Sequence, residues 1–280
     1  LIGARWYVDG FIAGAGSGKT RVLVHRAAWL MQVEHVSPQS LLAVTFTNKA
    51  ASEMRSRIEQ LLGMPTQHLW IGTFHGLAHR LLRRHWHEAN LPQNFQIIDS
   101  ADQDRLIKRM IKDSGKGDSE WSPREVKSFI NSNKDEGLRP QHIDDGGDPS
   151  KRQLIAFYAD YQEVCERAGL VDFAEILLRS LETWRANPDL LGHYQRRFRH
   201  LLVDEFQDTN AIQYAWLKLL TEGGAIPFAV GDDDQSIYRW RGAKVAHIGK
   251  YTLDFPDTLV VTLEQNYRPT GNILNAPNPI

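Results

Sequence analysis

The sequence predicts an α/β fold in which a parallel sheet is flanked by helices and is interrupted by an inserted all-α subdomain. Short apolar runs rich in β-branched residues indicate buried parallel strands. These runs are Leu41–Phe46, Leu201–Val203, Phe228–Val230 and Leu259–Leu263. Between the first and second runs, apolar residues recur at helical spacing, as in Leu77, Leu81 and Leu82. Strands separated by a long helical stretch favour an α/β domain with a helical insertion.

Glycine and proline clusters and a lack of strand signal mark residues 86–191 as this insertion. We therefore predict one α/β domain formed by residues 1–85 and 192–280, with a helical subdomain at residues 86–191.

The composition fits a soluble, unexported and cytoplasmic protein. Lys and Arg number 33 and Asp and Glu number 34, so no overall charge draws the chain to nucleic acid or to a membrane. Contact with nucleic acid must therefore be local. Cys165 is the only cysteine, which excludes an intrachain disulfide, and we expect it to be a small buried side chain. No apolar run approaches the roughly 20 residues that span a bilayer.

A glycine-rich segment at residues 13–20 reads Ala-Gly-Ala-Gly-Ser-Gly-Lys-Thr. It follows the apolar pair Phe11-Ile12 and precedes the amphipathic run Val22–Met31, which predicts the order strand, loop, helix. Backbone N–H groups of such a loop cradle phosphates, and the alternative is an ordinary glycine-rich turn. The predicted nucleotide contacts are Gly14, Ala15, Gly16, Ser17, Gly18, Lys19 and Thr20. Lys19 would reach the β and γ phosphates of ATP, and Thr20 would ligate Mg²⁺.

Two carboxylates end the apolar run Leu201–Val203. Asp204 would hold Mg²⁺ through its water shell, and Glu205 would polarise the water that attacks the γ phosphate. Acidic residues after strands also cap helices, so Asp204 and Glu205 indicate a nucleotide site only in combination with the glycine-rich loop.

Six strings in a fixed order resemble the motifs of the UvrD/Rep/PcrA family of superfamily 1 DNA helicases. They are AGAGSGKT at 13–20, VTFTNKAA at 44–51, GTFH at 72–75, VDEFQD at 203–208, GDDDQSIY at 231–238 and LEQNYR at 263–268. The resemblance covers nearly the whole chain and implies a RecA-like P-loop NTPase fold. It also implies the ATP-binding motor half of an ATP-dependent 3′–5′ DNA helicase in repair or replication, with loading proteins as partners.

Three alternatives compete with this interpretation. One is the helicase subunit of a recombination nuclease, which shares the motifs, and another is a non-catalytic DNA-binding fragment. A simple P-loop kinase fits less well, because it needs no water-activating carboxylate such as Glu205.

The family resemblance also implies three further nucleotide contacts. Gln235 would sense the γ phosphate, since an amide can both donate to a phosphate oxygen and accept from water. Arg268 would stabilise charge on the transferring phosphoryl group, and Tyr267 would stack on adenine. Without the resemblance, the alternatives are that Gln235 is a surface residue and that Tyr267 is a core residue.

Aromatic residues set among polar and basic ones suggest contact with single-stranded DNA. Stacking of a base on an aromatic ring contributes about 1–3 kcal/mol and reads no sequence, which suits a motor that moves over any strand. The candidate DNA contacts are Thr45, Phe46, Thr47, Asn48, Thr73, Phe74, His75, Tyr238 and Trp240. For Trp240 the alternative is a place in the core.

The helix expected from His75 to His87 would bury its leucines and turn Arg80, Arg83 and Arg84 outward. Such a basic face contacts phosphates or is simply solvated. Its four histidines invite a zinc site, which we reject because the spacing fits no closed site.

Both ends of the chain depart from the family pattern. No Gln precedes the loop, and Asp9-Gly10 is expected to interrupt the first strand. The chain stops soon after Arg268, before a second RecA-like domain. We therefore expect this chain alone to bind nucleotide weakly, to hydrolyse it slowly and not to unwind DNA.

Overall fold

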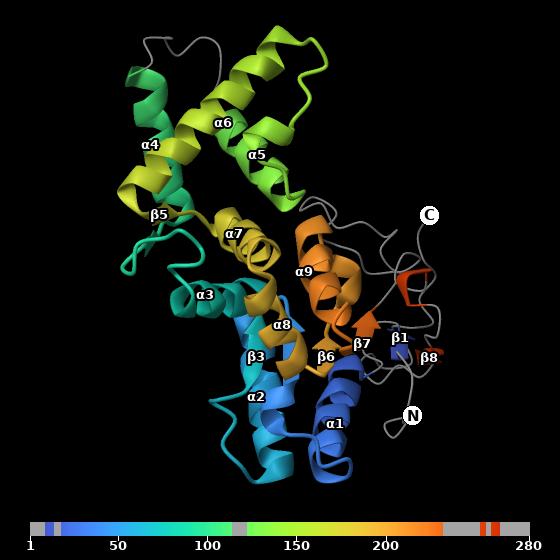
Figure 1. Cartoon of the computed structure of the whole chain (residues 1–280). Coiled ribbons are helices and arrows are strands. Elements are labelled where there is room, and N and C mark those ends of the chain that lie inside the picture. Colours follow the sequence, from blue (N-terminus) through green and yellow to red (C-terminus); the bar gives the residue numbers. More distant parts are fainter. Residues whose placement is uncertain (1–8, 14–17, 114–121, 232–252, 256–258, 264–280) are drawn as a thin grey trace, which may run out of the picture. The chain divides into compact units, whose positions relative to one another are not determined.

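A computed structural model describes residues 9–13, 18–113, 122–231, 253–255 and 259–263 (Figure 1). The chain divides into two compact units. Unit 1 is drawn from Leu1–Phe74, Leu191–Thr209 and Leu217–Ile280, and unit 2 from His75–Leu190 and Asn210–Trp216. The proposed insertion, residues 86–191, lies in unit 2 except for its last residue.

Unit 1 contains a six-stranded sheet in the order β3-β2-β6-β7-β1-β8. Its strands are β1 (Asp9–Ala13), β2 (Leu41–Thr45), β3 (Trp70–Thr73), β6 (His200–Val203), β7 (Ile226–Gly231) and β8 (Leu259–Leu263). Every pairing is parallel, which confirms the predicted fold class. The carboxyl ends of all six strands consequently lie at one edge of the sheet, where α/β domains bind ligands.

The strand register brings three chain segments together at this edge. Val203 of β6 pairs with Ala229 of β7, and Ile12 of β1 pairs with Gly231 of β7. The carboxyl ends of β1, β6 and β7 are therefore neighbours, although these strands are far apart in the sequence.

Helices cover both faces of the sheet (Figure 1). Helices α1 (Lys19–Gln32) and α2 (Asn48–Leu62) pack their apolar sides on Leu41, Ala43 and Ile71. On the opposite face, Trp70 meets Tyr194 of α8 (Pro188–Arg197) with ring centroids 5.7 Å apart. Alternate residues of a strand point to opposite faces, so adjacent Trp70 and Ile71 serve the two layers.

Two features of the sheet differ from the prediction. Strand β3 was not predicted, because its four residues, Trp-Ile-Gly-Thr, are short and contain a glycine. The interruption expected at Asp9-Gly10 was wrong, since β1 begins at Asp9 and pairs with both β7 and β8. Backbone hydrogen bonds hold a strand between two neighbours, so a missing side chain does not end it.

Unit 2 is mainly helical. Its helices are α3 (Phe74–Arg84), α4 (Ser100–Asp113), α5 (Pro123–Asp135), α6 (Pro149–Ala168), α7 (Phe173–Ala186) and the start of α9 (Ala211–Thr221). Side chains of α4, α5 and α6 form a separate apolar core that includes Ile107, Ile130 and Tyr158. Cys165 also lies in this core, which confirms its predicted burial.

Unit 2 corrects two details of the prediction. It is not purely helical, because β4 (Gln96–Ile97) and β5 (Leu170–Val171) form a short parallel pair. Helix α3 ends at Arg84 instead of His87, and its basic face is partly engaged, because the Arg83 guanidinium lies 3.8 Å from the Phe95 ring centroid.

Three 3₁₀ helices complete the described elements, namely η1 (Pro38–Ser40), η2 (Pro140–His142) and η3 (Phe206–Asp208). Within the described ranges, no helix combines the length and the apolar character that crossing a membrane requires.

Candidate nucleotide site

The start of α1 supplies the first half of the candidate site. Gly18 caps the helix at φ 87°, in the left-handed region that glycine tolerates and other residues rarely adopt. Lys19 and Thr20 are the first two helical residues, so both lie at the positive end of the helix dipole. A helix start of this kind is suited to bind anions. The predicted contacts Gly14, Ala15, Gly16 and Ser17 lie outside the described residues.

The end of β6 supplies the second half. Asp204 is 2% exposed, and its N–H donates to the Val44 carbonyl at 2.9 Å, which extends the sheet by one residue. Glu205 follows at φ 48°, in the left-handed region, and turns the chain into η3.

The structure brings the two halves into contact across 184 residues of sequence. The Thr20 hydroxyl donates to Oδ2 of Asp204 at 3.4 Å. The Lys19 ammonium lies 3.2 Å from Oε2 of Glu205. Lys19 is 7% exposed, so this ion pair is shielded from water on the side of the lysine.

Negative charge is concentrated at this place. Burial raises the pKa of Asp204 to about 6, with a further contribution from the neighbouring carboxylate of Glu205. Burial and Glu205 likewise raise the pKa of Asp208 to about 6. The Oδ1 atom of Asp208 is buried and has no hydrogen-bond partner among the described residues.

These residues fit a magnesium-bound triphosphate. A hydroxyl beside a buried carboxylate supplies oxygen ligands, which Mg²⁺ prefers. A divalent cation would relieve the repulsion between Asp204 and Glu205, and the Lys19 ammonium provides a point charge for a phosphate.

Five further predicted functional residues lie outside the described part of the chain. They are Gln235, Tyr238, Trp240, Tyr267 and Arg268.

The candidate DNA contacts of unit 1 fall into two groups. Thr45 and Phe74 are each 1% exposed, and the Phe74 ring packs edge-on against Phe46 with centroids 5.5 Å apart. Both side chains are thus enclosed in this structure, and DNA contact through Thr45 and Phe74 stays a prediction. Phe46, Thr47, Asn48 and Thr73 are half-buried or exposed. The Thr47 hydroxyl caps α2 by accepting from the Ala50 N–H at 3.1 Å.

The predicted DNA contact His75 lies in unit 2 beside an exposed aromatic residue, Phe173, which was not predicted from the sequence. The rings of His75 and Phe173 stack with centroids 3.7 Å apart and an interplanar angle of 16°. Phe173 is 60% exposed, although it is the first residue of α7 and follows the buried cap Asp172. No pattern in the sequence separates such a phenylalanine from a core residue, because burial at a helix start depends on what packs against it.

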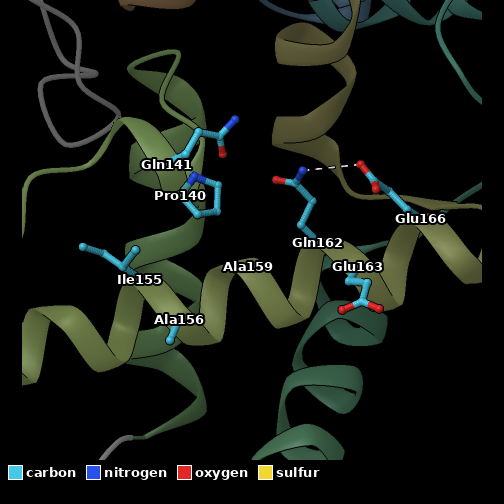
Figure 2. A pocket seen from close by; sticks show the side chains of 8 residues that line it. All are labelled: Pro140, Gln141, Ile155, Ala156, Ala159, Gln162, Glu163 and Glu166. Carbon is cyan, nitrogen blue, oxygen red and sulfur yellow. Dashed lines mark hydrogen bonds between the residues drawn. The ribbon is translucent and has the colours of Figure 1, made fainter.

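Unit 2 also carries a separate open hollow of about 410 Å³ beside η2 and α6 (Figure 2). It is lined by Pro140, Gln141, Ile155, Ala156, Ala159, Gln162, Glu163 and Glu166. The two carboxylates at one end and the apolar floor offer none of the phosphate-binding groups found at the start of α1.

A parallel sheet flanked by helices, with the candidate side chains at its carboxyl edge, is consistent with a RecA-like α/β domain. The chain belongs to the family of UvrD/REP helicase N-terminal domains, whose model matches residues 11–256.

Known relatives are similar over almost all of this chain. DNA helicase II of Escherichia coli (strain K12) is 60% identical over 269 residues, which are 96% of this chain and 37% of that protein. DNA helicase II of Haemophilus influenzae is 54% identical over 273 residues. The ATP-dependent DNA helicase PcrA of Bacillus subtilis (strain 168) is 42% identical over 270 residues, which are 96% of this chain and 36% of that relative. The chain thus spans little more than a third of the relatives' length.

Proposed function

We propose that this chain is the ATP-binding and single-stranded-DNA-binding motor half of an ATP-dependent 3′–5′ DNA helicase that acts in DNA repair or replication. The observation that supports the proposal most is the contact of Lys19 with Glu205 and of Thr20 with Asp204. The names of the relatives, DNA helicase II and ATP-dependent DNA helicase PcrA, agree with it.

Each side chain of the site has one task in this proposal. Lys19 would leave Glu205 to bind the terminal phosphates, while Thr20 and Asp204 would hold the metal. Glu205, released from the lysine, accepts a proton from the attacking water. A magnesium ion held by Thr20 and Asp204 would supply positive charge beside the phosphoryl group of ATP. By resemblance, Gln235 and Arg268 would contact the γ phosphate and Tyr267 the adenine.

The DNA-binding part of the proposal rests on half-buried and exposed side chains in each unit. In unit 1, Phe46, Thr47 and Asn48 follow the carboxyl end of β2, and Thr73 is the last residue of β3. In unit 2, the stacked pair of His75 and Phe173 presents an aromatic face that any base can cover. Tyr238 and Trp240 remain candidates by resemblance.

We further propose that this chain alone does not unwind duplex DNA. The motor mechanism implied by the family resemblance needs two RecA-like domains that close on the nucleotide. Robust unwinding of a 3′-tailed duplex by this chain alone would contradict this part of the proposal.

Replacement of Lys19 tests the nucleotide site. We expect the chain to bind magnesium-ATPγS, and Lys19→Ala to weaken this binding at least tenfold, about 1.4 kcal/mol, because the charge that meets the phosphates is lost. Isothermal titration calorimetry measures both affinities. The matched control is Lys112→Ala, which removes an exposed lysine at the end of α4 and leaves the affinity unchanged.

Two results would count against the nucleotide site. One is the absence of binding by the unaltered chain, and the other is an equal affinity in Lys19→Ala. Binding of oligo-dT without any binding of nucleotide favours the non-catalytic DNA-binding fragment.

Replacement of Phe173 tests the DNA surface of unit 2. We expect Phe173→Ala to weaken binding of fluorescent oligo-dT about tenfold, because a stacked base contributes about 1–3 kcal/mol. Fluorescence anisotropy at fixed salt measures the affinity. Val33→Ala removes another exposed apolar side chain, 56% exposed in unit 1, and serves as the control. An unchanged affinity in Phe173→Ala would remove this pair from the DNA-binding surface.

A further inference from the structure

Two donors hold the same oxygen of Glu205. The Lys19 ammonium lies 3.2 Å from Oε2, and the side-chain amide of Gln207 donates to Oε2 at 2.8 Å. None of the described residues donates to Oε1. The carboxylate is thus anchored at one oxygen, and its other oxygen remains available to accept a proton.

Gln207 is itself held tightly in place. Its residue is 2% exposed, and its chain position two residues after Glu205 puts both in the same tight turn. A Cβ atom added to Gly231 at the end of β7 would lie 2.9 Å from Oε1 of Gln207. The side chain of Gln207 therefore fills the space between Glu205 and the backbone of Gly231, and a larger residue at position 231 would push it away from this place.

The chemistry of an amide suits this position. Its N–H donates a hydrogen bond to the carboxylate without adding a charge, so the proton-accepting capacity of Glu205 is not neutralised as it is by a lysine. When Lys19 moves to the phosphates of a bound nucleotide, Gln207 is the donor that stays on Oε2.

We propose that Gln207 is a positioning residue for Glu205, which it orients so that Oε1 accepts the proton of the attacking water. The inference rests on the proposed function, because it assigns a role within ATP hydrolysis. It further assigns to Gly231 the role of leaving room for the Gln207 side chain.

The test compares two ligands, magnesium-ATPγS for the ground state and magnesium-ADP with aluminium fluoride for the transition state. An interaction that forms only in the transition state strengthens binding of the aluminium fluoride complex and leaves ATPγS binding unchanged. We expect Gln207→Leu to weaken binding of the aluminium fluoride complex about tenfold and to change ATPγS binding less than twofold. If the substitution only disturbed the structure of the site, it would weaken binding of both ligands to the same extent.

A double-mutant cycle separates an effect through Glu205 from an independent one. Glu205→Gln weakens the aluminium fluoride complex by itself, and adding Gln207→Leu to it causes no further weakening if Gln207 acts only through Glu205. Additive losses in the double variant would overturn the inference.

Gly231→Ala tests the same contact without altering Gln207. We expect it to weaken the aluminium fluoride complex in the otherwise unaltered chain and to have no further effect beside Gln207→Leu. This variant also keeps the inference falsifiable if Gln207→Leu fails to fold, as judged by circular dichroism. The matched control is Gln103→Leu, which removes a buried glutamine of unit 2 whose amide also points to a carboxylate, that of Asp172 at 3.4 Å. It leaves the ratio of the two affinities unchanged.

The possible failures are distinguishable. If the unaltered chain binds ATPγS and loses this binding in Lys19→Ala, the nucleotide site stands. If the same chain prefers the aluminium fluoride complex and keeps this preference in Gln207→Leu, the role of Gln207 is rejected while the site remains.

Discussion

Glu205 adopts φ 48°, a left-handed conformation that is costly for a residue with a side chain. Such strain costs on the order of 1–3 kcal/mol and is retained where the surroundings enforce it, often at functional sites. Here the strained turn has a visible effect. It ends β6 and starts η3, so that Gln207 and Asp208 return towards the carboxylate of Glu205.

Asp204 makes the stability of the chain depend on pH. Its folded-state pKa is raised to about 6, whereas an unfolded aspartate titrates near 4. Between these values the folded chain binds a proton that the unfolded chain does not. Protonation of Asp204 therefore stabilises the fold fully below pH of about 4, and this contribution is lost as the pH rises through about 6.

We expect Asp204→Asn to stabilise the metal-free and nucleotide-free chain at pH 7 by on the order of 1–2 kcal/mol, because it removes a buried charge. The free energy of unfolding in urea, measured with EDTA at pH 5 and pH 7, checks this. The gain is smaller at pH 5, where the wild-type carboxyl is largely protonated. Equal or lower stability of Asp204→Asn at pH 7 would show that the buried charge of Asp204 does not destabilise the fold.

At the scale of elements, a buried ion network joins α5 to α7. The Lys134 ammonium lies 2.5 Å from Oδ2 of Asp172 and 3.0 Å from Oε2 of Glu175, and the lysine is 2% exposed. Burial opposes the charge of Lys134, but the two carboxylates outweigh it and raise its pKa above the ordinary value. Arg139 binds both oxygens of Glu175 at 2.8 Å each. Removal of one charge leaves its partners buried and unbalanced.

We expect Lys134→Met, which keeps the side-chain length, to destabilise unit 2 by about 3–5 kcal/mol. Lys127→Met, on the same helix, breaks a surface ion pair with Asp104 and costs about 1 kcal/mol or less. Amide hydrogen exchange of α5, α6 and α7 in increasing urea measures both. Similar losses in the two variants would show that the buried network contributes no more than a surface pair.

The same network explains a local feature of helix α7. Asp172 caps this helix by accepting from the Glu175 N–H at 2.8 Å while it also binds Lys134 and the Tyr161 hydroxyl. One carboxylate thus fixes the start of α7 against α5 and α6. Phe173, the next residue, is held at the surface by this anchoring, because its neighbours on both sides are buried.

At the scale of the whole molecule, each unit has its own apolar core. The core of unit 1 joins α1 and α2 to the sheet, and that of unit 2 joins α4, α5 and α6. The nucleotide candidates lie in unit 1, whereas the ion network lies in unit 2. The boundaries predicted from the sequence, after residues 85 and 191, differ from those of the two units, because unit 2 begins at His75, reaches Leu190 and also includes Asn210–Trp216.

Much of the fold was predictable from local patterns. The strands β2, β6, β7 and β8 appear as β-branched apolar runs, because both faces of a parallel sheet are buried. The amphipathic run after the glycine-rich loop predicted α1 by the same kind of reasoning. Strand β3 and the pair β4–β5 were not predicted, because strands of two to four residues are too short to show an alternating pattern of apolar residues.

The sequence by itself determined the parallel α/β class, the helical insertion and the identity of the lysine, threonine and carboxylates of the candidate site. These follow from residue type and spacing, which act over a few neighbouring residues. Only the tertiary structure decided that Lys19 pairs with Glu205 and that Gln207 donates a hydrogen bond to the same oxygen. It also decided that Phe74 is buried and Phe173 exposed. Such contacts join residues that are remote in the chain or depend on a single backbone turn, and the order of amino acids specifies them only through packing of the whole fold.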